Sequence, residues 1–208
     1  MSGDEHREVK HYLVIDLEAT TDDGGDDERK VPRDEMETIE IGAVLVRANT
    51  LAVEAEFQTF VRPVRHPTLT PFCTELTSIT QDMLAEAPAF PEAMEALRQA
   101  MLVGRWGVVW GSWGLFDDTQ LRRDCVFHGV EYPMPEHMNL KNVFSAAQGP
   151  QAQALRHVEG ATSLRADPRG RAPPRTRRRE EHRAALAVDR RGRAAVGQVM
   201  RSLLPAQN

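Results

Sequence analysis

The stretch that decides the fold reads Leu13-Val14-Ile15-Asp16-Leu17-Glu18-Ala19-Thr20. An apolar run, typical of a buried strand, ends in two carboxylates spaced two residues apart. Residues i and i+2 of a strand point to the same face, so Asp16 and Glu18 are expected to project together. Neighbouring carboxylates repel each other unless a cation lies between them, and Mg²⁺ and Mn²⁺ prefer oxygen ligands. The stretch therefore predicts metal-assisted chemistry on a phosphate group.

The residues that follow predict an α/β domain with a mixed sheet. Apolar alternation predicts strands at 38–47 and 52–61, and the turn Asn49-Thr50 between them predicts an antiparallel pair. Residues 21–37 are acidic and contain glycine, which favours a solvated loop. The other expected elements are strands at 11–16 and 107–111 and helices at 74–85, 90–103, 116–128 and 140–147.

Bulk composition indicates a protein with one hydrophobic core. A length of 208 residues suggests one domain with a tail, and 41% apolar residues are enough for a core. The two cysteines, Cys73 and Cys125, are too few for a disulfide framework, which favours a reducing compartment. The first residues lack the apolar run of a signal peptide, and no stretch is long enough for a membrane span. We therefore expect a cytoplasmic protein with no membrane partner.

Charge divides the chain into two parts. Residues 1–150 carry 13 Lys and Arg against 26 Asp and Glu, whereas residues 151–208 carry 13 Arg against 5 acids. No aromatic residue follows Phe144, and Arg, Ala, Gly and Pro dominate after Pro150. The composition predicts a structured domain at 1–149 and a largely disordered tail at 150–208. The run Arg175-Thr176-Arg177-Arg178-Arg179 is also compatible with a nucleic-acid-binding arm.

Several motifs together resemble those of the DEDDh 3′–5′ exonucleases. Asp16-Leu17-Glu18-Ala19-Thr20 resembles their first motif, and Trp113-Gly114-Leu115-Phe116-Asp117-x-x-Gln120-Leu121 resembles their second. Residues 60–81, which include Leu76-Thr77-x-Ile79-Thr80-Gln81, resemble the branch with the histone-mRNA and small-RNA exoribonucleases and the sporulation-inhibitor exonucleases. Asn139-Leu140-Lys141-Asn142-Val143-Phe144 resembles the stretch that leads to the third motif. The resemblance covers residues 10–149.

This resemblance implies an RNase H-like mixed sheet flanked by helices and a hydrolase that removes 3′-terminal nucleotides. By position, Asp16, Glu18 and Asp117 match three of the family's four acidic metal ligands and are the expected catalytic residues. The expected cofactors are Mg²⁺ or Mn²⁺, two ions in the intact family. Its expected partner is a nucleic acid, with RNA favoured and DNA possible.

Other residues are open to two interpretations. Ala19, Thr20 and Thr77 match positions along the bound 3′ nucleotide in the family, although both threonines could equally be capping residues. Asp117 could instead be the N-cap of the helix that follows it, and Asp118 could fill either role.

Some conspicuous residues are expected to be structural. Glu40, on the second expected strand, is interpreted as structural or as a neighbour of the ligands. Trp106, Trp110 and Trp113 are expected in the core rather than as platforms for base stacking.

The family's third motif, a His followed five residues later by Asp, is not found. His157 and His182 have Thr162 and Ala187 at that spacing, so no general base is assigned. A reading frame shifted by one base can turn Pro173-Pro174-Arg175-Thr176-Arg177-Arg178 into His-Arg-Gly-Leu-Asp-Asp. We therefore interpret residues from about 150 onward as an out-of-frame translation. Activity is expected to be impaired, and the alternative is a non-catalytic nucleic-acid-binding protein that uses the cleft and the Arg-rich tail.

Overall fold

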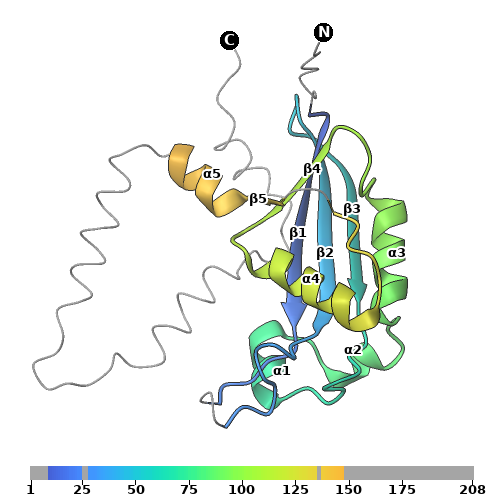
Figure 1. Cartoon of the computed structure of the whole chain (residues 1–208), viewed down its shortest axis with the longest axis vertical. Coiled ribbons are helices and arrows are strands. Elements are labelled where there is room, and N and C mark those ends of the chain that lie inside the picture. Colours follow the sequence, from blue (N-terminus) through green and yellow to red (C-terminus); the bar gives the residue numbers. More distant parts are fainter. Residues whose placement is uncertain (1–8, 25–27, 135–136, 148–208) are drawn as a thin grey trace, which may run out of the picture. The chain divides into compact units, whose positions relative to one another are not determined.

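The computed structural model describes residues 9–24, 28–134 and 137–147 (Figure 1). A compact unit extends to Leu140, and the helix that continues from it is described by itself. The elements are β1 (His11–Ala19), β2 (Thr38–Arg47), β3 (Val53–Phe60), α1 (Pro71–Thr77), α2 (Gln81–Ala85), α3 (Phe90–Ala100), β4 (Val108–Ser112), α4 (Phe116–His128), β5 (His137–Asn139) and α5 (Leu140–Ala147).

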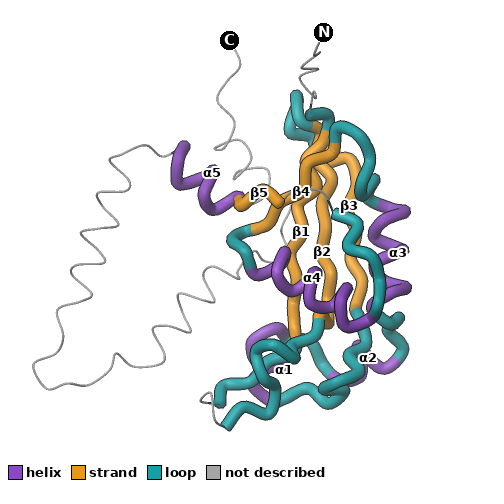
Figure 2. The backbone as a smooth tube through the Cα atoms, viewed as in Figure 1, coloured by secondary structure: helices purple, strands orange, loops and turns teal. Residues whose placement is uncertain are grey.

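The strands form one mixed sheet in the order β3-β2-β1-β4-β5 (Figure 2). β1 pairs with β2 and β2 with β3 in antiparallel register, which confirms the predicted hairpin. β1 and β4 are parallel, as are β4 and β5. β1 is therefore the central strand, and it is hydrogen-bonded to β2 on one side and to β4 on the other.

Helices α3 and α4 cover one face of this sheet (Figure 1). Leu13, Ile15 and Leu17 of β1 are buried on that face, because alternate residues of a strand point the same way. They pack in one core with residues of the two helices, which include Phe90, Met94, Leu97, Leu121 and Cys125. Asp16 and Glu18 project from the opposite face of β1, away from that core.

Helix α4 occupies the predicted range 116–128. Its buried residues recur at helical spacing and are Asp117, Gln120, Leu121, Asp124 and Cys125. The helix ends at Gly129, whose φ of 66° is the left-handed conformation that favours glycine after a helix. The side chain of Asp117 extends from the first turn of this helix and is buried.

The predicted helix at 74–85 was wrong, because the chain forms two short helices there. Ser78 has a φ of 64°, a left-handed conformation that ends α1. The hydroxyl of Thr77 accepts the Ile79 N–H at 3.1 Å, so a side chain replaces the helical bond at the break. Helix α2 starts again at Gln81.

Smaller differences concern the ends of elements. Helix α3 stops at Ala100, β1 continues to Ala19, and β5 was not predicted. Three residues are too few for a pattern, so β5 is set by its pairing with β4 rather than by local sequence.

The tryptophan predictions were partly wrong. Trp110 is fully buried in β4, as expected, but Trp106 is 60% exposed and Trp113 45% exposed. Both exposed residues lie outside the ends of β4.

The expected acidic loop is present in its described part. Asp22 is buried there, and its carboxylate accepts the N–H groups of Gly24 and Val31 at 2.9 and 2.6 Å. Residues 25–27 and the expected tail at 150–208 lie outside the described residues. In the described part of the chain, no helix is both long and apolar enough to span a membrane.

Candidate active site

Three acidic side chains share one face at the end of β1. Asp16 and Glu18 lie two residues apart, and Glu40 of β2 is the cross-strand partner of Glu18. Gln58 of β3 donates to the carboxylate of Glu40, so this third acid is held by the sheet itself. Among the described residues, no hydrogen bond or ion pair holds the carboxylates of Asp16 and Glu18. The face is strongly negative and open to a cation.

Helix α4 brings a further carboxylate to the same place. Oδ1 of Asp117 accepts the backbone N–H of Leu17 at 3.0 Å, between Asp16 and Glu18. Burial raises the pKa of Asp117, and the nearby hydroxyl of Ser112, the last residue of β4, partly offsets this effect. Asp117 is the second residue of α4 and not its N-cap, so the capping interpretation was wrong.

Asp118 has a different environment from Asp117. Its carboxylate is bonded by the guanidinium of Arg122 at 3.0 Å and by the hydroxyl of Tyr132 at 2.7 Å. Arg122 also lies over the ring of Tyr132, with 4.0 Å between its guanidinium carbon and the ring centroid. These contacts occupy Asp118, which leaves Asp117 as the acid of α4 that meets β1.

The charges of this cluster perturb one another. Desolvation, followed by the charges of Asp117 and Glu40, raises the pKa of Asp16 to about 6. The side chain of Asp16 is solvent-exposed, so water screens part of this effect. Desolvation and the charges of Asp16, Glu40 and Asp117 raise the pKa of half-buried Glu18 to about 7. Mutual repulsion of this kind is relieved by a bound cation.

The carboxylates at this face suit a hard divalent ion, but they are not arranged around one metal position. All of the acids at this face offer carboxylate oxygens, the ligands that Mg²⁺ and Mn²⁺ prefer. However, across 9–24, 28–134 and 137–147 no group of three or more His, Cys, Asp or Glu side chains stands ready to hold a metal. Without a cation the carboxylates repel one another. This repulsion accounts for acids that share one face but do not converge on a single metal position.

A buried polar network fixes the position of α4. Asp124 accepts the N–H and hydroxyl of Thr38 at 3.1 and 2.6 Å, which joins α4 to the start of β2. Gln120 donates to Asp124 and to the carbonyl of Met36. Gln120 belongs to the stretch that resembles the second motif, but neither it nor Asp124 was predicted as a site residue. The spacing of Gln120 and Asp124 on the buried face of α4 was the available signal.

The predicted substrate-binding residues border the acids, and two of them have structural contacts. The hydroxyl of buried Thr20 accepts the Glu37 N–H at 2.9 Å, and Ala19 is also buried. Half-buried Thr77 donates its hydroxyl to the carbonyl of Cys73 at 2.9 Å. The thiol of Cys73 in turn points to the carbonyl of Ala19, so α1 lies beside the end of β1. A capping role for Thr77 is therefore present in the structure.

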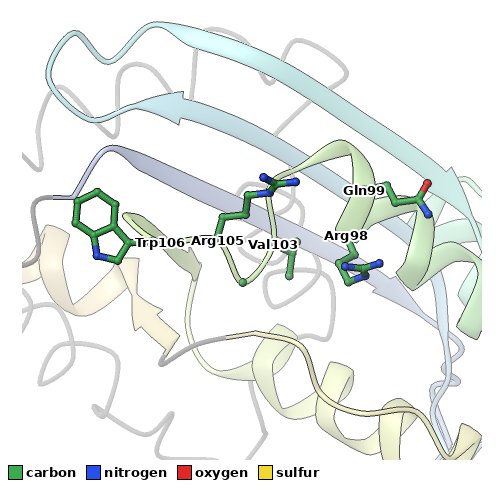
Figure 3. Close-up of a pocket in the computed structure, with 6 residues that line it drawn as sticks. Arg98, Gln99, Val103, Arg105 and Trp106 are labelled. Carbon is green, nitrogen blue, oxygen red and sulfur yellow. The ribbon is translucent and has the colours of Figure 1, made fainter.

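A cavity of about 610 Å³ lies near the other end of β1 and β4 (Figure 3). It is lined by Arg98, Gln99, Val103, Gly104, Arg105 and Trp106. Trp106 precedes β4, and Lys10, which precedes β1, lies 4.2 Å from its ring centroid. No carboxylate lines this cavity, so it is separate from the acidic face.

A mixed sheet with acids at the end of its central strand, met by an acid from a helix, defines the class of RNase H-like nucleases. The sequence profile of the RNase_T family, described as exonuclease, matches residues 13–158. The chain belongs to this exonuclease family.

Individual relatives agree with this assignment. Human ERI1 exoribonuclease 3 is 32% identical over 151 residues, which cover 67% of this chain and 42% of the relative. The solved nuclease domain of 3'hExo, a DEDDh family member bound to rAMP, is 28% identical, with a TM-score of 0.61. That match covers 70% of this chain and 74% of the solved chain. The RNase H-like fold is thereby confirmed, while the chain spans less than half the length of the curated relative.

Proposed function

We propose that residues 1–149 form a metal-dependent 3′–5′ exonuclease domain that removes nucleotides from RNA or other single-stranded 3′ ends. The observation that carries the proposal is the meeting of Asp117 with the strand that bears Asp16 and Glu18, at 3.0 Å from the Leu17 N–H. Exoribonucleases among the relatives support RNA as the substrate. Cys73 and Cys125 are both buried and free, which supports a reducing compartment such as the cytoplasm.

In this proposal Asp16, Glu18 and Asp117 hold Mg²⁺ or Mn²⁺. Bound divalent ions would neutralise the phosphodiester and lower the pKa of an attacking water. Asp117 is oriented by the Leu17 N–H, so its carboxylate is held before any ligand arrives. Ala19, Thr20 and Thr77 form the edge that borders the terminal nucleotide, and Thr20 is buried at this edge.

We further propose that turnover by this chain is impaired. No His and Asp pair at the family's spacing follows Phe144 in the sequence. Loss of a general base typically lowers the rate by about 10²- to 10⁴-fold. The proposed cause is a shifted reading frame. Sequencing the coding DNA tests it, because a one-base insertion or deletion is then expected near codons 149–150. An undisrupted gene would contradict it.

The activity is tested with 5′-labelled single-stranded RNA and Mn²⁺. We expect a slow ladder of products that shorten from the 3′ end, abolished by chelation and by Asp16→Asn. Asp82→Asn, which changes an exposed acid on α2, is the matched control and should leave the ladder unchanged. An identical ladder from Asp16→Asn would contradict the assignment.

The second candidate is a non-catalytic nucleic-acid-binding protein, favoured by the absent third motif and the 13 Arg residues after position 150. It predicts RNA binding that weakens steeply with salt, with no shortening of the RNA. Removal of residues 151–208 would then abolish the affinity.

A further inference from the structure

Helix α4, which carries Asp117, also carries an exposed arginine and an exposed aromatic ring. Arg123 and Phe127 lie four residues apart, and residues at this spacing are neighbours on one face of a helix. The guanidinium carbon of Arg65, from the loop after β3, lies 3.6 Å from the centroid of the Phe127 ring. Arg65 and Arg123, here called the arginine pair, therefore lie on the same exposed face of α4.

Arg65 is held in place at both its backbone and its side chain. Its N–H donates to the buried carboxylate of Glu37 at 2.8 Å. Phe127 meets His128 edge to face with 4.7 Å between centroids, and His128 stacks on buried Phe90 at 5.1 Å. A row of rings thus connects the guanidinium to the core, so little side-chain freedom is left to lose when an anion binds.

Among the residues that the structure describes, neither guanidinium of the arginine pair forms an ion pair with an acid. Arg123 donates to the carbonyl of Arg33 at 3.1 Å, which is a neutral acceptor. Arg65 contacts an aromatic ring, which attracts the cation but leaves its N–H donors available. Residues 1–150 carry 26 acids against 13 bases, so two adjacent guanidinium groups without an acid partner in the described structure predict an anionic ligand.

The same helix sets the distance between the arginine pair and the proposed metal site. Arg123 follows Asp117 by six residues and Phe127 follows it by ten, which corresponds to about 9 and 15 Å along the helix axis. The acidic face repels the RNA backbone, so the strand behind its 3′ end needs cations further from the acids. A guanidinium can bond two oxygens of one phosphate, and such contacts do not depend on the base.

We propose that the arginine pair binds the phosphate backbone of RNA upstream of its 3′ end. The inference rests on the proposed function, which places that 3′ end at Asp16, Glu18 and Asp117. RNA is favoured over an acidic protein because its own 3′ end lies, in that proposal, beside the N-terminal end of the helix that carries Arg123. The arginine pair thus compensates for the repulsion between the substrate and the acidic face.

The test measures binding of the full chain to a fluorescently labelled twelve-nucleotide RNA by anisotropy, with EDTA present so that no RNA is cleaved. Arg65→Gln combined with Arg123→Gln should weaken binding roughly tenfold at low salt, because each exposed charge contact is weak. Each lost phosphate contact should also reduce the slope of log affinity against log salt by about 0.7. The Arg residues after position 150 are unchanged in every variant, so the difference in slope reports on the arginine pair.

Arg47→Gln combined with Arg98→Gln is the matched control. It also removes two exposed positive charges, but these are already paired with Glu54 and Glu95. Its RNA affinity and salt dependence should equal those of the parent chain. Replacing both members of the arginine pair by Lys keeps their charges and should restore most of the salt dependence. Urea unfolding of each variant separates a lost contact from a lost fold.

Parental affinity and salt dependence in the double glutamine variant of the arginine pair would overturn the proposal, and so would an equal loss in the control. A variant that loses binding to a polyglutamate peptide but binds RNA as the parent does would assign the arginine pair to an acidic protein, which also overturns it. The proposed exonuclease function fails separately. In that case the RNA affinity falls as expected in the variant, while the parent chain with Mn²⁺ gives no products that shorten from the 3′ end.

Discussion

The backbone N–H of Leu17 donates to Oδ1 of Asp117 at 3.0 Å, although the two residues are 100 positions apart in the sequence. This bond places an acid of α4 against the strand that carries Asp16 and Glu18. Since Asp117 raises the pKa of both Asp16 and Glu18, the cluster is costly without a cation. Its energetics can therefore be measured independently of any RNA cleavage.

Asp16→Asn is expected to stabilise the metal-free protein at pH 8. The folded-state pKa of Asp16 is about 6, above its ordinary value of 3.8, so the folded protein binds this proton more tightly than the unfolded chain. The charge therefore destabilises the fold above pH 6, and the penalty fades as pH falls from 6 to 4. After discounting for solvent screening, we expect a gain on the order of 1 kcal/mol at pH 8.

Urea unfolding of the parent chain and Asp16→Asn at pH 8 and pH 4 measures this difference. Mn²⁺ at pH 8 should reverse the order of stability, because an ion that binds only the folded parent stabilises it. A variant that is less stable than the metal-free parent at pH 8 would contradict the repulsion described here.

Glu37→Ala is expected to cost about 2 to 3 kcal/mol of folding stability. The buried carboxylate of Glu37 accepts the N–H groups of Val64, Arg65 and His66 at 2.8 to 2.9 Å. Removing it leaves three donors without their acceptor. Glu37→Gln retains one side-chain oxygen and should cost less, and thermal unfolding of the two variants would rank them. Equal stability of both variants and the parent would argue against a structural role for this acid.

Asp124→Ala is expected to cost about 2 kcal/mol and to weaken Mn²⁺ binding as well. Asp124 joins α4 to Thr38 of β2, so its loss releases the helix that carries Asp117. Glu95→Gln breaks the ion pair with Arg98 on the exposed side of α3, and it should leave stability nearly unchanged because water screens this pair. Chemical unfolding measures the stability of each variant, and Mn²⁺ titration measures the metal affinity of Asp124→Ala. A destabilised Asp124→Ala with parental Mn²⁺ affinity would separate the two effects and refute the coupling.

Gly111→Ala is expected to destabilise the protein, whereas Gly42→Ala is expected to be tolerated. A Cβ at Gly111 would lie 2.5 Å from the carbonyl oxygen of Met138, where β4 pairs with β5. A Cβ at Gly42 would have its nearest neighbour, the carbonyl oxygen of Asp16, at 3.7 Å. Both glycines lie in strands, so the pair controls for the change of residue type. Similar melting temperatures for the two variants would contradict this packing.

Patterns within one element were sufficient to predict much of the fold. The range of α4 and the hairpin of β2 and β3 follow from apolar spacing and a turn, which depend on neighbours in the sequence. Ser78 breaks the predicted helix at 74–85 through a left-handed backbone conformation, which the apolar pattern does not encode. β5 likewise depends on β4, because three residues have no strand preference strong enough to act alone.

The sequence by itself determined the central strand, the pair Asp16 and Glu18 on one of its faces, and the resemblance that pointed to Asp117. Only the tertiary structure decided how Asp117 is held, because its hydrogen-bond donor Leu17 lies in β1, 100 positions away in the sequence. A side chain's hydrogen-bond partners depend on distances in space, and residues far apart in sequence carry no local signal of them. The periodicity of one strand is local, whereas the arrangement of the acids is a property of the folded sheet and helix together.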